Sequence, residues 1–144
     1  RPTRIRMFDS VLNLIVGGTT GHETFGLAPV SLLVIETDGS YELVDSLKSA
    51  FDGAAGTHTS VFSHSLDEVL RHPGVVARQI GAEALCDTCL ACPIHRVCGG
   101  GLYTHRYRAG HGFRNPSVFC ADLAKLVRHV AERLLTDLRH RVGA

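Results

Sequence analysis

The residues with the clearest chemical potential are the cysteines, which gather in one part of the chain. All five lie between Cys86 and Cys120, and from Cys89 onward the intervals are two, five and twenty-one residues. A segment this short cannot bury so many thiols as ordinary core. Three thiolates on one tight loop and a fourth from a distant element can close a tetrahedral shell around an ion or a cluster. The spacing therefore predicts a metal site formed by Cys89, Cys92, Cys98 and Cys120.

The residues around the cysteines favour the same interpretation. Pro93 follows Cys92 directly and fixes the direction in which the chain leaves that residue. Cys98 is followed by the glycines 99–101, which can reach positive φ and can bring backbone N–H groups close to sulfur. Such contacts would offset the negative charge of bound thiolates.

The alternatives are buried free cysteines, a disulfide framework and zinc. Five is an odd number, and cytosolic chains rarely keep disulfides. A structural zinc ribbon usually has two Cys-x2-Cys knuckles, of which only one is present, so zinc is not excluded. The histidines His95, His105 and His111 could also ligate. Four cysteines already complete a shell, so we expect these to be ordinary loop or surface histidines.

The pattern Cys89-x2-Cys92-x5-Cys98-x21-Cys120, with glycines 99–101 and the segment 115–120 (Asn-Pro-Ser-Val-Phe-Cys), resembles the SPASM domain. This is the C-terminal auxiliary-cluster module of radical S-adenosylmethionine (radical SAM) enzymes that modify peptides and proteins. The sequence is most similar to the FxsB-like subgroup, whose relatives crosslink side chains in ribosomally made peptides. The likeness covers residues 86–122 and extends more weakly back to residue 31.

The resemblance implies that the four cysteines hold an auxiliary [4Fe-4S] cluster. It also implies two partners, which are an N-terminal radical SAM catalytic domain and a precursor peptide. In this family S-adenosylmethionine binds only in the catalytic domain. The competing hypothesis is a non-enzymatic zinc module for protein–protein contacts.

Two departures from the family pattern matter. The ligand positions of the family's first auxiliary cluster fall here on Val44 and Leu102, and residues 23–29 contain no cysteine. That cluster therefore cannot form in the usual way. Cys86 is additional, and it could replace a ligand, bind elsewhere or be free. The radical-initiating loop, Cys-x3-Cys-x2-Cys, is absent, so we expect the chain alone to be inactive.

Composition and length bound the remaining possibilities. The 144 residues are 44% hydrophobic and 20% charged with a net charge of +1, which predicts one globular domain without nucleic acid or membrane as partner. A reducing cytoplasm suits the thiols. The chain begins Arg1-Pro2 without methionine, so we expect a fragment or a processed product.

The pattern of the whole chain predicts an α+β fold comprising a β-hairpin, several helices, the cysteine loop and a long C-terminal helix. We expect a single domain 1–144: residues 1–30 form a helix and a linker that leave a missing catalytic barrel, residues 31–85 the hairpin and helices, and residues 86–144 the cluster loop and last helix. The first helix should span residues 4–16, followed by a loop in which His22 and Glu23 are solvated.

Local signals give the finer expectations. Asp38-Gly39 predicts a type I′ hairpin turn, and the small residues 52–59 predict a mobile connector. Ser65 and Glu68 form a capping box before a helix, and another helix should cover residues 74–82. Residues 103–114 mix basic residues with tyrosine, and we expect a solvated excursion. The last helix should have Ser117 as N-cap and Cys120 in its first turn, so that losing the metal loosens its start.

Overall fold

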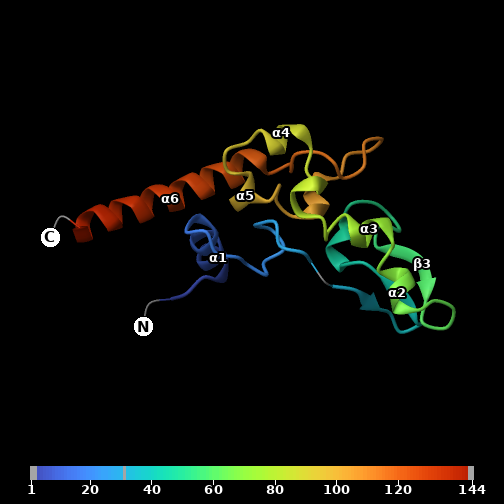
Figure 1. Ribbon diagram of the computed structural model, residues 1–144. Coiled ribbons are helices and arrows are strands. Elements are labelled where there is room, and N and C mark those ends of the chain that lie inside the picture. The colour runs from blue at the N-terminus through green and yellow to red at the C-terminus, as the bar shows by residue number, and fades with distance from the viewer. Residues whose placement is uncertain (1–2, 31, 143–144) are drawn as a thin grey trace.

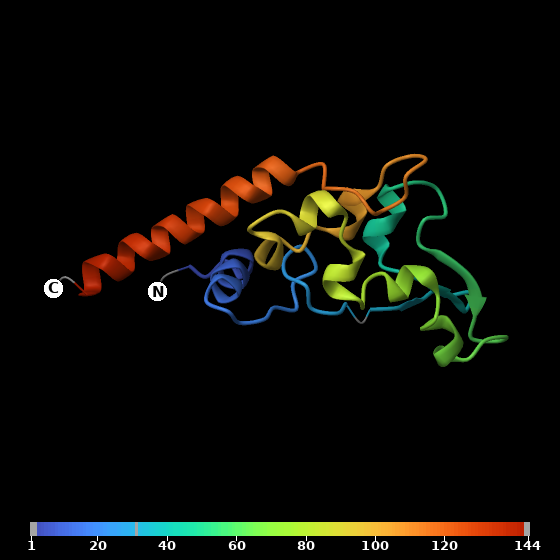
Figure 2. The ribbon, with the colours of Figure 1, turned by 45° about the horizontal axis from the view of Figure 1, so that its top comes forward.

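The computed structural model describes residues 3–30 and 32–142; Arg1, Pro2, Ser31 (the first residue of the predicted hairpin) and residues 143–144 lie outside the description. The chain is elongated, with a small sheet towards one end and a long helix extending at the other (Figures 1 and 2). The helices are α1 (Arg6–Ile15), α2 (Leu66–Val69), α3 (Pro73–Val76), α4 (Asp87–Leu90), α5 (His95–Cys98) and α6 (Cys120–Val142). The strands are β1 (Val34–Ile35), β2 (Ser40–Glu42) and β3 (Gly56–Ser60), and the 3-10 helices are η1 (Asp45–Ser49), η2 (Gly81–Ala84) and η3 (Tyr103–Arg106). This arrangement confirms the predicted α+β class. None of the helices in the described ranges has the length and apolarity to cross a membrane.

Helix α1 is the amphipathic helix predicted for residues 4–16. Its apolar residues point to one side, and Val11 is completely buried against Phe25 and Val127. Gly17 follows the helix with a φ of +86°, a left-handed conformation that glycine adopts without a steric penalty. Residues 19–29 then form no helix or strand, as the sequence predicts.

The hairpin forms, but its turn differs from the prediction. Strands β1 and β2 pair antiparallel. A type I′ turn requires positive φ at both Asp38 and Gly39, and of these two only Gly39 has it, at +83°. The Glu36 amide donates to the Ser40 carbonyl at 2.9 Å, which encloses a three-residue loop with glycine in the left-handed position. The Asp38 carboxylate accepts from the Ser40 amide at 2.9 Å, and this local bond favours the longer turn.

The expectation of a mobile connector at residues 52–59 is wrong for residues 56–59, because these belong to β3. It pairs antiparallel with β2 and gives the strand order β1-β2-β3. Thr57 is buried, and its hydroxyl donates to the Tyr41 carbonyl. Thr57 and Thr59 are β-branched and suit a strand, although glycine and alanine neighbours obscure the pattern. The sheet and the turns beside it share a core of Leu43, Val44, Leu47, Ala55 and Val75.

The two short helices before the cysteines are only partly as predicted. The capping box is confirmed: the Ser65 amide donates to the Glu68 carboxylate at 2.7 Å, and the Glu68 amide donates to the Ser65 hydroxyl at 3.4 Å. The helix expected over residues 74–82 is wrong in extent, since α3 ends at Val76 and η2 begins at Gly81. Gly81 has a φ of +57°, which an α-helix cannot accommodate.

Residues 103–114 are held by aromatic packing, so the expected solvated excursion is wrong for most of this segment. The Tyr103 and Phe113 rings stack with their centroids 4.6 Å apart, and both pack on the core beside the sheet. Phe51 extends the group through Tyr107, at 4.8 Å between centroids. Only the tip, residues 108–112, is exposed throughout.

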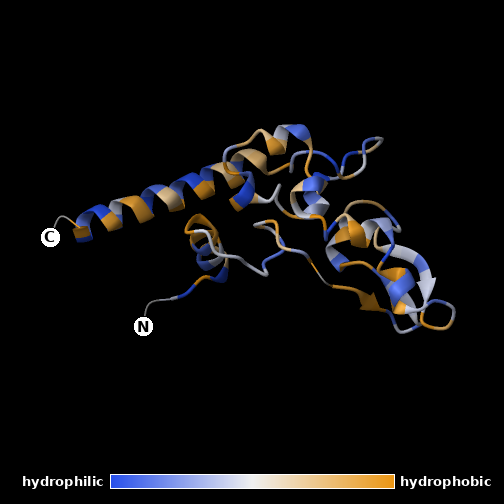
Figure 3. Cartoon of the chain, viewed as in Figure 1, coloured by the Kyte–Doolittle hydropathy of each residue, from blue (hydrophilic) through white to orange (hydrophobic). Residues whose placement is uncertain are grey.

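Helix α6 begins at Cys120, as the sequence predicts for its first turn, but Ser117 is not its N-cap. The Ser117 hydroxyl accepts from the Phe119 amide at 3.1 Å and shapes the turn that precedes the helix. The first half of α6 packs against α1 and α5 through Leu123, Leu126, Val127 and Val130. The distal half extends beyond α1 (Figure 3). Its apolar residues Leu135 and Leu138 are about half exposed.

Candidate metal centre

The four predicted cysteine ligands lie in or next to two one-turn helices and at the start of the long C-terminal helix. Cys89 is buried in the one-turn helix α4, and Cys92 follows that helix. Cys98 is the last residue of α5, and Cys120 is the first residue of α6. The predicted loop is thus a pair of one-turn helices followed by a glycine turn. All five cysteines of the chain are free thiols.

The structure brings Cys89, Cys92, Cys98 and Cys120 to one cavity. It has a volume of about 40 Å³ and is closed on other sides by Ile94, Ser117 and Ala124, among others. Cys86 is not among the residues that line it. Cys86 instead precedes α4 as its N-cap residue, and its thiol forms a hydrogen bond with Cys89. The fifth cysteine is therefore a neighbour of one predicted ligand and lies outside the shared cavity.

Burial favours the protonated form of two of these thiols, Cys89 and Cys98. It raises the pKa of Cys89 to about 12, with further contributions from the hydrogen bond to Cys86 and from the charges of Cys86 and Cys120. Burial also raises the pKa of Cys98. The backbone amides of Gly100 and Gly101 act in the opposite direction at Cys98, because hydrogen bonds to sulfur stabilise the thiolate.

The sequence analysis predicts that the three glycines after Cys98 can adopt positive φ, and all three do: Gly99 +61°, Gly100 +78° and Gly101 +73°. Each also permits a close approach. A Cβ on Gly99 would lie 1.9 Å from the Gly26 carbonyl oxygen, and one on Gly101 would lie 2.7 Å from a Leu123 methyl group. The Gly26 amide donates to the Val97 carbonyl at 2.9 Å. The loop after α1 is therefore fastened to the cysteine segment through backbone atoms.

Arg106 is a neighbour of this segment that the sequence analysis missed. Its guanidinium donates to the carbonyls of Gly99 and Gly101, at 2.7 and 3.0 Å. A Cβ on Gly100 would lie 3.1 Å from the guanidinium carbon, so the absent side chain provides the space for Arg106. The basic, tyrosine-rich composition of residues 103–114 indicated a solvated surface and gave no sign of this contact.

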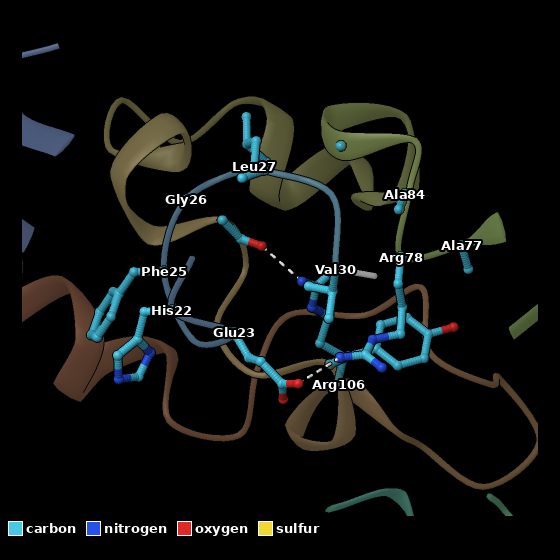
Figure 4. Close-up of a pocket in the computed structure, with 14 residues that line it drawn as sticks. His22, Glu23, Phe25, Gly26, Leu27, Val30, Ala77, Arg78, Ala84 and Arg106 are labelled. Carbon is cyan, nitrogen blue, oxygen red and sulfur yellow. Dashed lines mark hydrogen bonds and ion pairs between the residues drawn. The ribbon is translucent and has the colours of Figure 1, made fainter. Parts of the chain in front are cut away.

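A second pocket, of about 50 Å³, is lined by Gly99, Arg106 and residues of the loop after α1, among others (Figure 4). Glu23 and Arg78 form an ion pair there, at 3.1 Å between oxygen and nitrogen, and the Arg78 side chain is almost fully buried. The expectation that His22 and Glu23 are a solvated loop pair is therefore wrong for Glu23. His22 accepts from the Thr24 amide through Nδ1, at 3.2 Å, which makes it part of the loop structure.

The other histidines are placed as follows. His95 lines the cysteine cavity, and its Nδ1 is 2.8 Å from the Cys92 carbonyl oxygen. His105 makes an edge-on contact with Phe119, at 4.8 Å between centroids. His111 is exposed in the tip 108–112. Of the three, only His95 is among the residues that line the cysteine cavity.

One acidic group was also missed by the sequence analysis. Carboxylate oxygens of Glu36, Glu42 and Asp45 lie within 4.8 Å of one another. The Lys48 ammonium lies 2.8, 2.7 and 3.2 Å from them, respectively, and neutralises part of their charge. This group is an ion-pair network that joins η1 to the hairpin.

Comparison with known proteins identifies the fold. No protein-family model matches the sequence, and no curated protein matches it significantly. Solved structures of anSMEcpe, an anaerobic sulfatase-maturating radical SAM/SPASM enzyme, do match. Native anSMEcpe with bound AdoMet superposes with a TM-score of 0.66 and 16% identity over 99% of this chain and 38% of that chain. The hexahistidine-tagged form with bound AdoMet gives 0.67 and 18% over 96% and 35%.

A third structure, native anSMEcpe with bound AdoMet and Kp18Cys peptide, gives a TM-score of 0.66 and 18% identity over 96% of this chain and 37% of that chain. The chain therefore spans little more than a third of the length of the solved structures that it matches. At these identities the likeness shows the fold alone. The fold of this chain is similar to that of about a third of the anSMEcpe structures.

Proposed function

We propose that this chain is the auxiliary-cluster domain of a radical SAM/SPASM enzyme that modifies a peptide. Cys89, Cys92, Cys98 and Cys120 bind its [4Fe-4S] cluster. The observation that carries the proposal is the cavity lined by these four side chains, with Cys86 outside it. The relation of the fold to a radical SAM/SPASM enzyme supports it independently of the cysteine spacing.

The residues present fit an iron–sulfur cluster better than a zinc ion. Thiolates alone suit both metals. In a tetrahedral zinc site with Zn–S bonds of about 2.3 Å, the sulfurs lie roughly 3.8 Å from one another. Among the residues described, no three cysteine sulfurs lie within 4.8 Å of one another. A four-iron cluster gives each thiolate its own iron and so needs a wider cage, which favours the cluster over the structural zinc module.

The chain's own residues would prepare the site in three ways. The amides of Gly100 and Gly101 stabilise the thiolate of Cys98. Ile94 and Ala124 give the cavity apolar walls that limit water. The helix N-terminus at Cys120 favours negative charge on that sulfur. When bound, a fully ligated cluster supplies electron transfer, with its potential set by hydrogen bonds and burial.

We further propose that the domain carries a single auxiliary cluster. One ligand position of the family's other auxiliary cluster falls on Val44, which is 4% exposed and packed in the core beside the sheet. A buried valine fills that position with apolar surface, so a second cluster has no ligand there.

The partners are proposed from the same relation. The full enzyme would contain an N-terminal catalytic domain that binds S-adenosylmethionine, and its substrate would be a ribosomally made precursor peptide in the cytoplasm. The anSMEcpe structures that match include complexes with Kp18Cys and Cp18Cys peptides, which supports a peptide substrate. Side-chain crosslinking and membership of the FxsB-like subgroup stay predictions from the cysteine and glycine motifs.

The test is anaerobic reconstitution of the chain with iron and sulfide, followed by metal analysis and electron paramagnetic resonance of the reduced protein. The proposal expects four irons per chain, as a [4Fe-4S] cluster requires. Cys98→Ala should lose the cluster and much of the loaded protein's stability, because metal-ligand free energy is also folding free energy, of the order of 10 kcal/mol in structural zinc sites. Cys86→Ala is the matched control and should retain both.

Two results would contradict the proposal. Colourless protein with stoichiometric zinc, prepared without oxygen, would identify the structural zinc module instead. Equal loss of iron in Cys86→Ala and Cys98→Ala would refute the four-ligand assignment. Oxygen must be excluded throughout, because it destroys exposed clusters and leaves their thiolates free to take up zinc.

A further inference from the structure

The Arg106 side chain places a positive charge against the glycine turn that follows Cys98. One of its terminal nitrogens donates to both the Gly99 and the Gly101 carbonyl. The guanidinium carbon lies 5.6 Å from the centre of the Tyr103 ring, which adds a cation–π contact. Its Nε is buried and has no hydrogen-bond partner within the described part of the chain. The side chain is thus fixed in place, with one buried donor unused.

Within the residues that the structure describes, no carboxylate neutralises this charge. Among the described residues, 3–30 and 32–142, Arg106 takes part in none of the ion pairs. Glu23 lines the same pocket, but it is paired with Arg78 (Figure 4). A charge withdrawn from water without a partner is unfavourable. Consistent with this, burial lowers the pKa of Arg106.

The groups that oppose this effect are thiols and a phenol. Cys89 comes first, followed by Tyr103, Cys98 and Cys86, all close enough for their charges to raise the pKa of Arg106. The carbonyls that Arg106 binds belong to Gly99 and Gly101, which directly follow Cys98 in the glycine turn. Cysteines bound to iron are thiolates, and a cluster with four thiolates is an anion. The charge of Arg106 thus lies beside the segment that would carry this negative charge.

We propose that Arg106 supplies the compensating positive charge for the cluster bound by Cys89, Cys92, Cys98 and Cys120, and thereby raises its reduction potential. This inference rests on the proposed function. Reduction adds negative charge to the cluster, and a fixed cation nearby stabilises the reduced form more than the oxidised form. Arg106 acts as a positioning residue through its field and its bonds to the glycine turn. It does not ligate the cluster.

The experiment compares the reduction potential of the anaerobically reconstituted chain with those of Arg106→Gln and Arg106→Lys. A unit charge about 10 Å from a cluster, at an effective dielectric constant of about 20, changes the ratio of reduced to oxidised cluster roughly tenfold at a fixed applied potential. For a one-electron couple that is about 59 mV. Arg106→Gln should therefore have the more negative potential, and Arg106→Lys should stay close to the parent.

Arg96→Gln is the matched control for the loss of one charge. Arg96 lies between Cys92 and Cys98 in the sequence but is exposed, so solvent screens its charge and the potential should stay unchanged. An Arg106→Gln protein with full iron content and the parent's potential would overturn the inference and leave the proposed function intact. If the parent chain takes up no cluster, the proposed function fails first, and the inference fails with it.

If Arg106→Gln binds the cluster poorly, melting temperatures provide a second measurement. Charge compensation predicts that this substitution lowers the melting temperature of the loaded protein more than that of the metal-free protein, and that lysine restores most of the difference. Equal losses in both forms, with no rescue by lysine, would mean that Arg106 only braces the glycine carbonyls, and would overturn the inference.

Discussion

Gly99 brings two distant backbone segments closer together than any residue with a side chain permits. Replacing it by alanine would place a Cβ 1.9 Å from the Gly26 carbonyl oxygen, in addition to the cost of a left-handed residue. We expect Gly99→Ala to lower the free energy of unfolding by about 2–4 kcal/mol, measured by urea denaturation of the reduced, metal-free protein.

Gly110→Ala is the control for backbone conformation alone. Gly110 has a φ of +76°, but no atom lies within 4 Å of the position of its Cβ. Its substitution should cost about 1 kcal/mol, the penalty of left-handed backbone. If the two variants are equally stable, the Gly26–Gly99 contact has no energetic importance.

The buried thiols predict how the metal-free protein responds to pH. Cys89 has a pKa raised by burial to about 12 in the folded chain, whereas an unfolded cysteine titrates near 9. The folded state therefore binds the proton more tightly, and stability falls as pH rises from the unfolded towards the folded pKa. Urea midpoints under reducing conditions should decrease between about pH 8 and about pH 10.5, that is, from below the unfolded pKa to between the two values.

Cys89→Ala is the comparison for this pH effect. It should make the decrease in stability shallower, although the raised pKa of Cys98 leaves part of it in place. An identical pH dependence in the parent and the variant would show that ionisation of Cys89 is not coupled to folding.

At the level of single residues, the sequence predicted what depends on spacing and missed what depends on distant neighbours. Four cysteines at defined intervals indicate a common site, and the structure gives Cys89, Cys92, Cys98 and Cys120 one cavity. Their role as ligands stays a prediction. The importance of Arg106 arises from the carbonyls of a turn and from burial, neither of which is visible in residues 103–114. The turn at Asp38-Gly39 went wrong for a similar reason, since an aspartate side chain can stabilise more than one turn type.

Among the elements, α6 connects the cysteine cavity to the helical core. It starts at Cys120, and its first half packs on α1 and α5. Metal binding at Cys120 would fix the first turn, whose backbone amides have no partner within the helix. We expect loading to slow amide hydrogen exchange about tenfold or more over residues 120–125.

The distal half of α6 provides an internal reference for this measurement. Leu135 and Leu138 are about half exposed and far along the helix from Cys120, so exchange at residues 135–142 should not change on loading. Uniform protection along the helix would indicate a general stabilisation of the fold and would count against local coupling at Cys120.

The elements that the sequence predicted well are those with a long period or a local motif. Helices α1 and α6 each repeat apolar residues over several turns, and α2 follows a complete capping box. Strand β3 was missed because five residues with a glycine at one end show little alternation, and pairing with β2 determines its conformation. The break at Gly81 was also invisible, because its left-handed conformation depends on packing beside Leu27.

For the whole molecule, we predict that the chain alone does not cleave S-adenosylmethionine. Radical initiation requires an iron left open for the substrate, whereas four cysteine ligands would leave none. The chain also spans little more than a third of the length of the anSMEcpe structures that it matches. Reconstituted protein with dithionite and S-adenosylmethionine should release no 5′-deoxyadenosine above a protein-free control. Release that is abolished by Cys89→Ala would mean that the cluster has an open iron.

The contact between the loop after α1 and the cysteine segment bears on how such a module could be exchanged between proteins. Phe25 is buried with Val11 and Val127, and Gly26 is bonded to Val97. The loop after α1 thus packs on the cysteine segment, although the sequence predicted residues 1–30 only as a helix and a linker. A crossover at residue 31 would combine a foreign loop with the native cysteines and replace the Gly26 carbonyl that lies against Gly99. Natural or engineered hybrids are therefore expected to preserve function only when the crossover lies ahead of α1.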